Sequence, residues 1–121
     1  MTGKQSLNII QKNSSALITF VKPAQRLQVV NASKGFIDLG GVIPEGANYV
    51  LVEVESLSNK ADEGIRFLNT GENVNSSFGL RRFDKEFFDI EGSENIAKFK
   101  CFDITRSDTA VVLNVQFGIK R

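Results

Sequence analysis

Histidine and tryptophan are absent from this 121-residue chain, and cysteine, methionine and tyrosine occur once each. Without histidine there is no imidazole base, which excludes Ser-His-Asp and Cys-His nucleophiles and histidine-based zinc sites. A single cysteine excludes an internal disulfide, a thiolate metal cage and an iron–sulfur site. An enzyme built from this chain would therefore depend on carboxylates or lysine.

Strong net charge and long apolar runs are also missing. The formal net charge is +1, so no field draws in nucleic acid or an anionic membrane. No apolar run approaches the roughly 20 residues that span a bilayer, and residues 1–15 lack the apolar segment of a signal peptide. We therefore expect neither a nucleic-acid nor a membrane partner.

The aromatic content is almost entirely phenylalanine, with ten Phe against one Tyr. Sugar-binding and single-strand nucleic-acid surfaces usually use Tyr and Trp, which combine a flat face with a polar group. Phe is more often a core residue. Cys101 has the parity of Phe99 in a predicted strand, so we expect a small buried side chain rather than a reactive thiol.

What the chain does contain is one long alternating segment, residues 109–119 (TAVVLNVQFGI). Successive side chains of a strand point to opposite faces, so the alternation predicts a strand with one face in a core. The apolar face holds Thr109, Val111, Leu113, Val115, Phe117 and Ile119. The other face is small or amide-bearing, with Asn114 and Gln116, and is expected to be thinly covered or to face a partner.

Shorter strands separated by turn residues precede this segment. We expect strands at residues 16–22, 25–31, 36–39, 49–57, 65–68, 78–83, 87–90 and 96–104, with a hairpin turn at 84–86. Nine to ten strands at about ten-residue spacing indicate an all-β fold, an antiparallel β-sandwich or a jelly-roll-like arrangement. Residues 1–15 are interpreted as an N-terminal arm and residues 16–121 as a single β-sandwich domain.

A helix is the alternative for residues 80–87, where Leu80, Phe83 and Phe87 recur at helical spacing. Against it, the segment is short, rich in Phe and ends in the strand-like sequence of residues 87–90.

An acidic run, residues 84–94, raises the question of carboxylate catalysis. Asp89 and Glu91 share one face of the predicted strand, near the roughly 5–9 Å separation of glycosidase carboxylates. They alternate with Phe88 and Ile90, however, as the solvated face of a half-buried strand does. Residues 62–63 and 69–75 carry oxygen ligands but lack the aspartate alternation of a calcium loop. We expect no catalytic, cofactor or metal site.

The order of motifs from residue 64 onward resembles small β-structured accessory proteins of tailed-bacteriophage virions. The residues that carry the resemblance are GIRF (64–67), NTG (69–71), NSSFG (75–79), FFDIEG (87–92), IAKF (96–99) and AVVLNVQF (110–117). The chain departs from that pattern at residues 84–86, which lack the usual glycine and leave the geometry of this turn open.

The resemblance implies a non-enzymatic structural protein made in the host cytoplasm and located on the capsid surface of a virion. It would be a decoration (cement) protein that binds the major capsid protein or another virion protein at capsomer junctions, commonly as a homotrimer. Candidate contact residues are Leu7, Ile9 and Ile10 of the arm, the adjacent Arg81 and Arg82, and the amide pair Asn114 and Gln116.

Two other functions compete with this interpretation. The polar segments 58–64 and 69–77 favour a receptor- or glycan-binding module of a phage tail or fibre. The acidic run alone favours a carboxylate hydrolase, with Asp89 and Glu91 as the pair to replace in a test.

Overall fold

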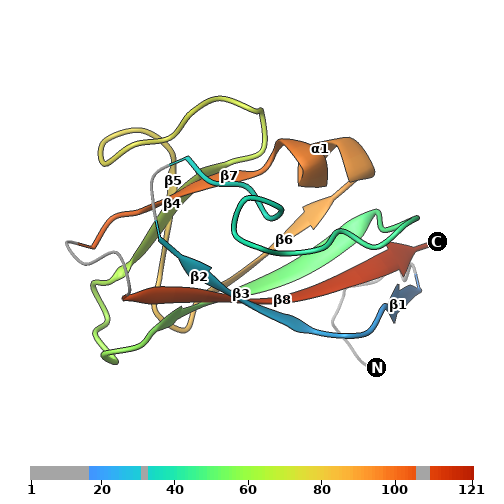
Figure 1. Ribbon diagram of the computed structural model, residues 1–121, viewed down its shortest axis with the longest axis horizontal. Coiled ribbons are helices and arrows are strands. Elements are labelled where there is room, and N and C mark those ends of the chain that lie inside the picture. Colours follow the sequence, from blue (N-terminus) through green and yellow to red (C-terminus); the bar gives the residue numbers. More distant parts are fainter. Residues whose placement is uncertain (1–16, 31–32, 106–109) are drawn as a thin grey trace, which may run out of the picture.

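The computed structural model describes residues 17–30, 33–105 and 110–121. Figure 1 shows β4, β5 and β7 gathered on one side of β2, β3 and β8. The elements are β1 (Ile18–Phe20), β2 (Gln25–Val29), β3 (Tyr49–Ser56), β4 (Gly64–Leu68), β5 (Leu80–Phe83), β6 (Phe87–Glu91), α1 (Ser93–Lys98), β7 (Lys100–Asp103) and β8 (Val111–Lys120).

The strands form two antiparallel sheets. The large sheet has the order β1-β8-β3-β6, with β2 also paired to β8, and the small sheet has the order β5-β4-β7. Strand β8 lies inside the large sheet, because β3 pairs with it on one side while β2 and then β1 pair with it on the other. The antiparallel, β-sandwich-like fold predicted from the sequence is confirmed, with eight strands in the described residues rather than nine or ten.

The core lies between the two sheets, and β8 supplies its centre. Val111, Leu113, Val115 and Phe117 are at most 1% exposed. The neighbouring β3 contributes Val50, Val52 and Val54 to the same face, and the small sheet contributes Ile65, Phe67 and Cys101. The alternation predicted for residues 109–119 is therefore confirmed for the described part of that segment.

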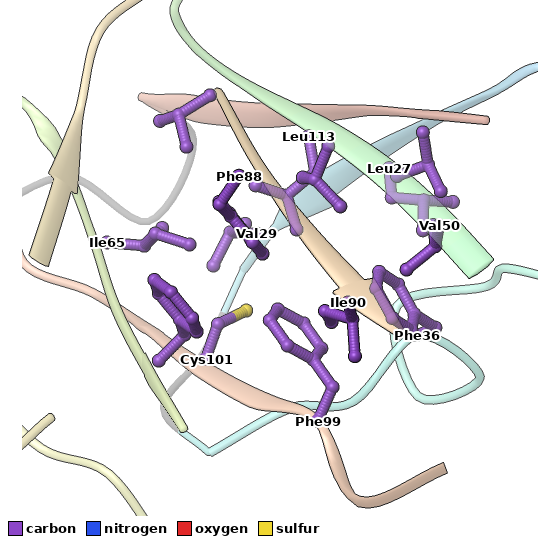
Figure 2. Close-up of a cluster of buried hydrophobic side chains, with 14 of the residues drawn as sticks. Leu27, Val29, Phe36, Val50, Ile65, Phe88, Ile90, Phe99, Cys101 and Leu113 are labelled. Atoms are coloured by element: carbon purple, nitrogen blue, oxygen red, sulfur yellow. The ribbon is translucent and has the colours of Figure 1, made fainter. Parts of the chain in front are cut away.

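Phenylalanine rings fill the space between the sheets (Figure 2). Phe99 stacks on Phe36 with ring centroids 4.3 Å apart, and Phe67 stacks on Phe88 at 4.2 Å. The sulfur of Cys101 points into this cluster, and burial raises the pKa of its thiol. The interpretation of Cys101 as a small buried side chain is confirmed.

The strand predicted at residues 36–39 is wrong, because this segment is a turn. Leu39 donates to the Gly35 carbonyl, and Gly41 donates to the Phe36 carbonyl, so local hydrogen bonds replace a ladder. Gly40 adopts a φ of 89°, which reverses the chain without the penalty a side chain would bring. The turn buries Phe36 and leaves Ile37 exposed.

The strand predicted at residues 96–104 begins later than expected, because residues 93–98 form α1 and only β7 is extended. Ile96 and Phe99 both enter the core, and their three-residue spacing suits one turn of helix followed by a bend. Phe99 and Cys101 are two residues apart, the spacing of one strand face, so the sequence pattern predicted a strand and did not indicate the helix.

The hairpin predicted around residues 84–86 is also wrong, because β5 and β6 belong to different sheets. The connection crosses from one sheet to the other. It is hydrogen-bonded to β3. The backbone N–H of Lys85 donates to the Val54 carbonyl, and the Asp84 carboxylate accepts from the Ser56 backbone N–H. Lys85 has a φ of 69° at the turn where the resemblance leads one to expect glycine. The helical alternative for residues 80–87 is excluded, because strands occupy both ends of the segment.

We expect Phe99→Ala to lower the free energy of unfolding by about 3–5 kcal/mol, since it removes a buried stacked ring. Urea denaturation measures this loss. The matched change Phe78→Ala, at a ring that is 46% exposed, is expected to cost less than about 1 kcal/mol. Equal losses at the two positions would contradict the assignment of Phe99 to the core.

Candidate functional site

The outer face of the large sheet, turned away from the core, carries a surface hollow beside the predicted contact residues Asn114 and Gln116. Asn114 and Gln116 of β8 point to this face, beside Leu51 and Glu53 of β3, with which they are paired. The hollow, called the outer hollow below, has a volume of about 310 Å³. It is lined by Ala24, Gln25, Arg26, Leu51, Glu53, Phe87, Asn114, Val115 and Gln116.

A second hollow of about 430 Å³ adjoins it, sharing Ala24 and Gln116. This edge hollow lies where the sheet edge passes from β1 to β2 at residues 21–24. Pro23 cannot donate a ladder hydrogen bond, so the edge strand is interrupted there. Phe20 forms one wall and packs edge-on against Tyr49.

Gly118 permits this packing at the end of β8. A Cβ at this position would lie 3.0 Å from Ile18 Cγ2 and 3.2 Å from the Thr19 carbonyl oxygen. Glycine therefore lets β1 approach β8 closely and lets the Phe20 ring lie over the sheet.

A polar network borders the outer hollow. Arg26 Nη1 donates to Glu55 Oε1 at 2.7 Å and to Asn114 Oδ1 at 3.0 Å. Asn114 Nδ2 donates to Glu53 and to Glu55, so its amide joins β2 to β3 across β8. The hydrogen bond from Arg26, supported by that from Asn114, lowers the pKa of Glu55, and the same contact raises the pKa of Arg26. Both side chains are open to solvent, so the network mainly orients Asn114 rather than stabilising the fold.

The predicted carboxylate pair lies on the same outer face, at the edge strand β6. Asp89 accepts a hydrogen bond from the Tyr49 hydroxyl at 3.0 Å, and Glu91 forms an ion pair with Lys120. Burial and the bond to Asp89 raise the pKa of Tyr49. Both carboxylates are exposed and neither lines the outer hollow. The exposure of both carboxylates matches the solvated strand face inferred from the sequence.

Arg81 and Arg82 lie on β5 of the small sheet and are not brought together with Asn114 and Gln116. Arg81 is exposed and is paired across the strands with Arg66. Arg82 is half-buried on the opposite face, with its guanidinium carbon 5.9 Å from the centre of the Phe67 ring. Of the two adjacent arginines, Arg81 is thus the one that points to solvent. Leu7, Ile9 and Ile10 lie outside the described residues.

Of the nine residues that line the outer hollow, the sequence predicted two as contacts, Asn114 and Gln116. Among the seven that it missed are Arg26, Leu51 and Phe87. All three belong to outward positions of strands that the sequence did predict. The alternation of each strand could have identified them, because it places Leu51 and Phe87 on the solvent face although both side chains are apolar. Identifying the site also needed the order of strands, which local patterns do not supply.

No group of three or more Cys, Asp or Glu side chains among the described residues is arranged to hold a metal ion. The one described helix, α1, is also too short to cross a membrane. Compared with protein-family models, curated proteins and solved structures, the chain matches none. The geometry of the outer face therefore carries the functional argument.

The Glu55 carboxyl should titrate below the ordinary glutamate value of about 4.3. Because its folded-state pKa is lowered, its stabilising contribution is present above the unfolded pKa and is lost as the pH falls through the folded pKa. We expect Arg26→Gln to raise the midpoint in an NMR titration of the carboxyl carbon. Arg81→Gln on the small sheet serves as the control and should leave it unchanged. An unaltered midpoint in the Arg26 variant would contradict the network.

Proposed function

We propose that this chain is a non-enzymatic structural protein of the virion decoration type, acting by protein–protein contact through the outer face of the large sheet. The observation that carries the proposal is the outer hollow, in which apolar Leu51 and Phe87 lie beside hydrogen-bonding Asn114 and Gln116. Apolar groups with a polar border are the usual composition of a protein interface. The order of motifs from residue 64 onward supports the virion setting.

The proposed mechanism is preferential binding to the assembled shell. Copies at capsomer junctions contact neighbouring subunits of the major capsid protein or another virion protein, and these junctions exist only after assembly. Binding that favours the assembled state stabilises that state by mass action. A homotrimer would match the symmetry of a local threefold position. The protein would be made in the host cytoplasm and would reside on the capsid surface, without a nucleic-acid or membrane partner.

A receptor- or glycan-binding module of a tail or fibre is the second candidate function. The outer hollow favours it, because the Glu53 carboxylate, three side-chain amides and the Arg26 guanidinium line the hollow together with the exposed Phe87 ring. The polar segments that first suggested it, residues 58–64 and 69–77, instead use several of their polar side chains in hydrogen bonds within the protein. Glu63 accepts from Ser56 and Ser58, and Asn73 accepts from Lys100. If the protein fails to bind both isolated surface polysaccharide and host cells at millimolar ligand, this candidate function is excluded.

The decoration role is tested by stripping the protein from particles and adding it back. We expect the wild-type protein to rebind intact heads and to raise the temperature at which they open. Gln116→Arg, in the outer hollow, should weaken rebinding about tenfold or more, equivalent to about 1.4 kcal/mol.

The control is Ala97→Arg, which adds the same charge at an exposed position of α1. It should rebind like the wild type. Heads of unchanged stability after stripping, or equal rebinding by both variants, would reject the proposed role.

A further inference from the structure

Strand β6 forms one edge of the large sheet, because β3 is its one partner strand among the described residues. At the two ends of this pairing, the Glu86 carbonyl accepts from the backbone N–H of Val54, and the backbone N–H of Gly92 donates to the Asn48 carbonyl. An antiparallel ladder bonds every second residue, so the even-numbered residues of β6 direct their backbone groups toward β3. The backbone groups of its odd-numbered residues therefore point away from the sheet.

These outward backbone groups belong to Phe87, Asp89 and Glu91. The Glu91 carbonyl accepts from the side-chain amide of Asn95. The backbone N–H and C=O groups of Phe87 and Asp89 have no hydrogen-bond partner among the described residues, and both side chains are exposed. Unpaired groups along a sheet edge can bond a further strand.

The other sheet edges in the described part of the chain are less open to a new strand. On β7, Cys101 exchanges backbone hydrogen bonds with Lys34. The edge formed by β1 and β2 is interrupted at Pro23, which has no N–H to donate. β5 is four residues long and carries two arginines, and short edges with cationic side chains resist pairing. β6 has the sequence FFDIE, with neither proline nor a cation, and is therefore the edge best suited to strand addition.

Asp89 and Phe87 restrict which strand can pair with β6. Asp89 accepts a hydrogen bond from the Tyr49 hydroxyl, and neither ion pair of the described residues includes it. Opposite charges on neighbouring strands stabilise a sheet and like charges destabilise it, so a strand with lysine or arginine beside Asp89 is favoured. Phe87 is 56% exposed and also lines the outer hollow. A strand added at β6 would therefore continue the surface proposed above for docking.

We propose that the protein partner of the outer face contributes an extended segment, which adds to the large sheet beside β6 with a lysine or arginine next to Asp89. The backbone groups of Phe87 and Asp89 bond this segment. In recognition by strand addition, main-chain hydrogen bonds supply affinity and alternate side chains supply selectivity. The inference rests on the docking role proposed for the outer face and states how its partner binds.

Amide hydrogen exchange in the full chain tests the geometry of this edge. We expect the Phe87 and Asp89 amides to exchange faster than those of Phe88 and Ile90, which face β3. Slow exchange at Phe87 and Asp89 in the free protein would mean that the edge is already occupied. If that protection rose with protein concentration, the occupant would be a second copy, and if it did not, a segment of the same chain. Either result would overturn the inference.

The probe for strand addition is a synthetic peptide of five lysine–valine repeats, whose lysines share one face when the peptide is extended. We expect it to bind and to slow exchange at Phe87 and Asp89. Asp89→Pro removes the outward N–H but no donor to β3, whereas Asp89→Asn removes the same charge and keeps the N–H. Asp89→Pro should therefore bind the peptide about tenfold more weakly than Asp89→Asn.

Two controls separate the contribution of charge from that of the backbone. Asp89→Asn should weaken peptide binding about threefold relative to the wild type, while Glu45→Gln, the same charge change in an exposed turn, should have no effect. Methylating the backbone nitrogens of the peptide's lysines keeps their charges and removes the donors that face β6, so binding should fall about tenfold. Methylating the backbone nitrogens of its valines, which point away from β6, should leave binding unchanged.

The outcomes distinguish strand addition from the docking role itself. The absence of peptide binding, equal affinity of Asp89→Pro and Asp89→Asn, or equal affinity of the two methylated peptides would each overturn the inference. Equal rebinding of Asp89→Pro and Asp89→Asn to stripped heads would also overturn it and would leave the proposed function standing. Peptide binding at β6 by a protein that does not rebind heads would reject the proposed function alone.

Discussion

The structure depends on β8 being paired along both of its sides. Strands β1 and β2 occupy one side and β3 occupies the other, so its backbone is satisfied within the sheet and its side chains face two different environments. Phe117 and Leu113 anchor the core on one face, while Asn114 and Gln116 reach the surface on the other. Core and candidate site are thus two sides of one strand, and a register shift of one residue would exchange them.

The register of β8 also determines the composition of the outer face. It aligns Leu51 with Gln116 and Glu53 with Asn114, and β6 then adds Phe87 and Asp89 beside them. No catalytic group is needed to explain this arrangement. Apolar side chains, amides and a carboxylate line the hollow on this face, and we propose that they bind a protein surface, as the motifs of the second half of the chain led us to expect.

The sequence predicted the parts of the fold in which one hydrophobic period governs a segment. Residues 109–119 and 49–57 alternate clearly, and the faces of residues 111–119 and 49–57 were assigned correctly. Prediction failed where short-range hydrogen bonds override the period, as in the turn at residues 36–39 and in α1. Asn114 and Gln116 were identified from the two-residue alternation of this final strand alone. Leu51, Phe87 and Arg26 join them only through pairing between strands distant in sequence, which no local pattern specifies.

We propose that the outer face of the large sheet is a protein-binding surface on a virion shell. Cryo-electron microscopy of intact particles tests it most directly, because the sandwich is asymmetric enough to be oriented in the density. The account predicts copies on the head at capsomer junctions, with β8, β3 and β6 turned toward neighbouring protein. Particles without this protein on the head, or copies whose outer face is open to solvent, would contradict it.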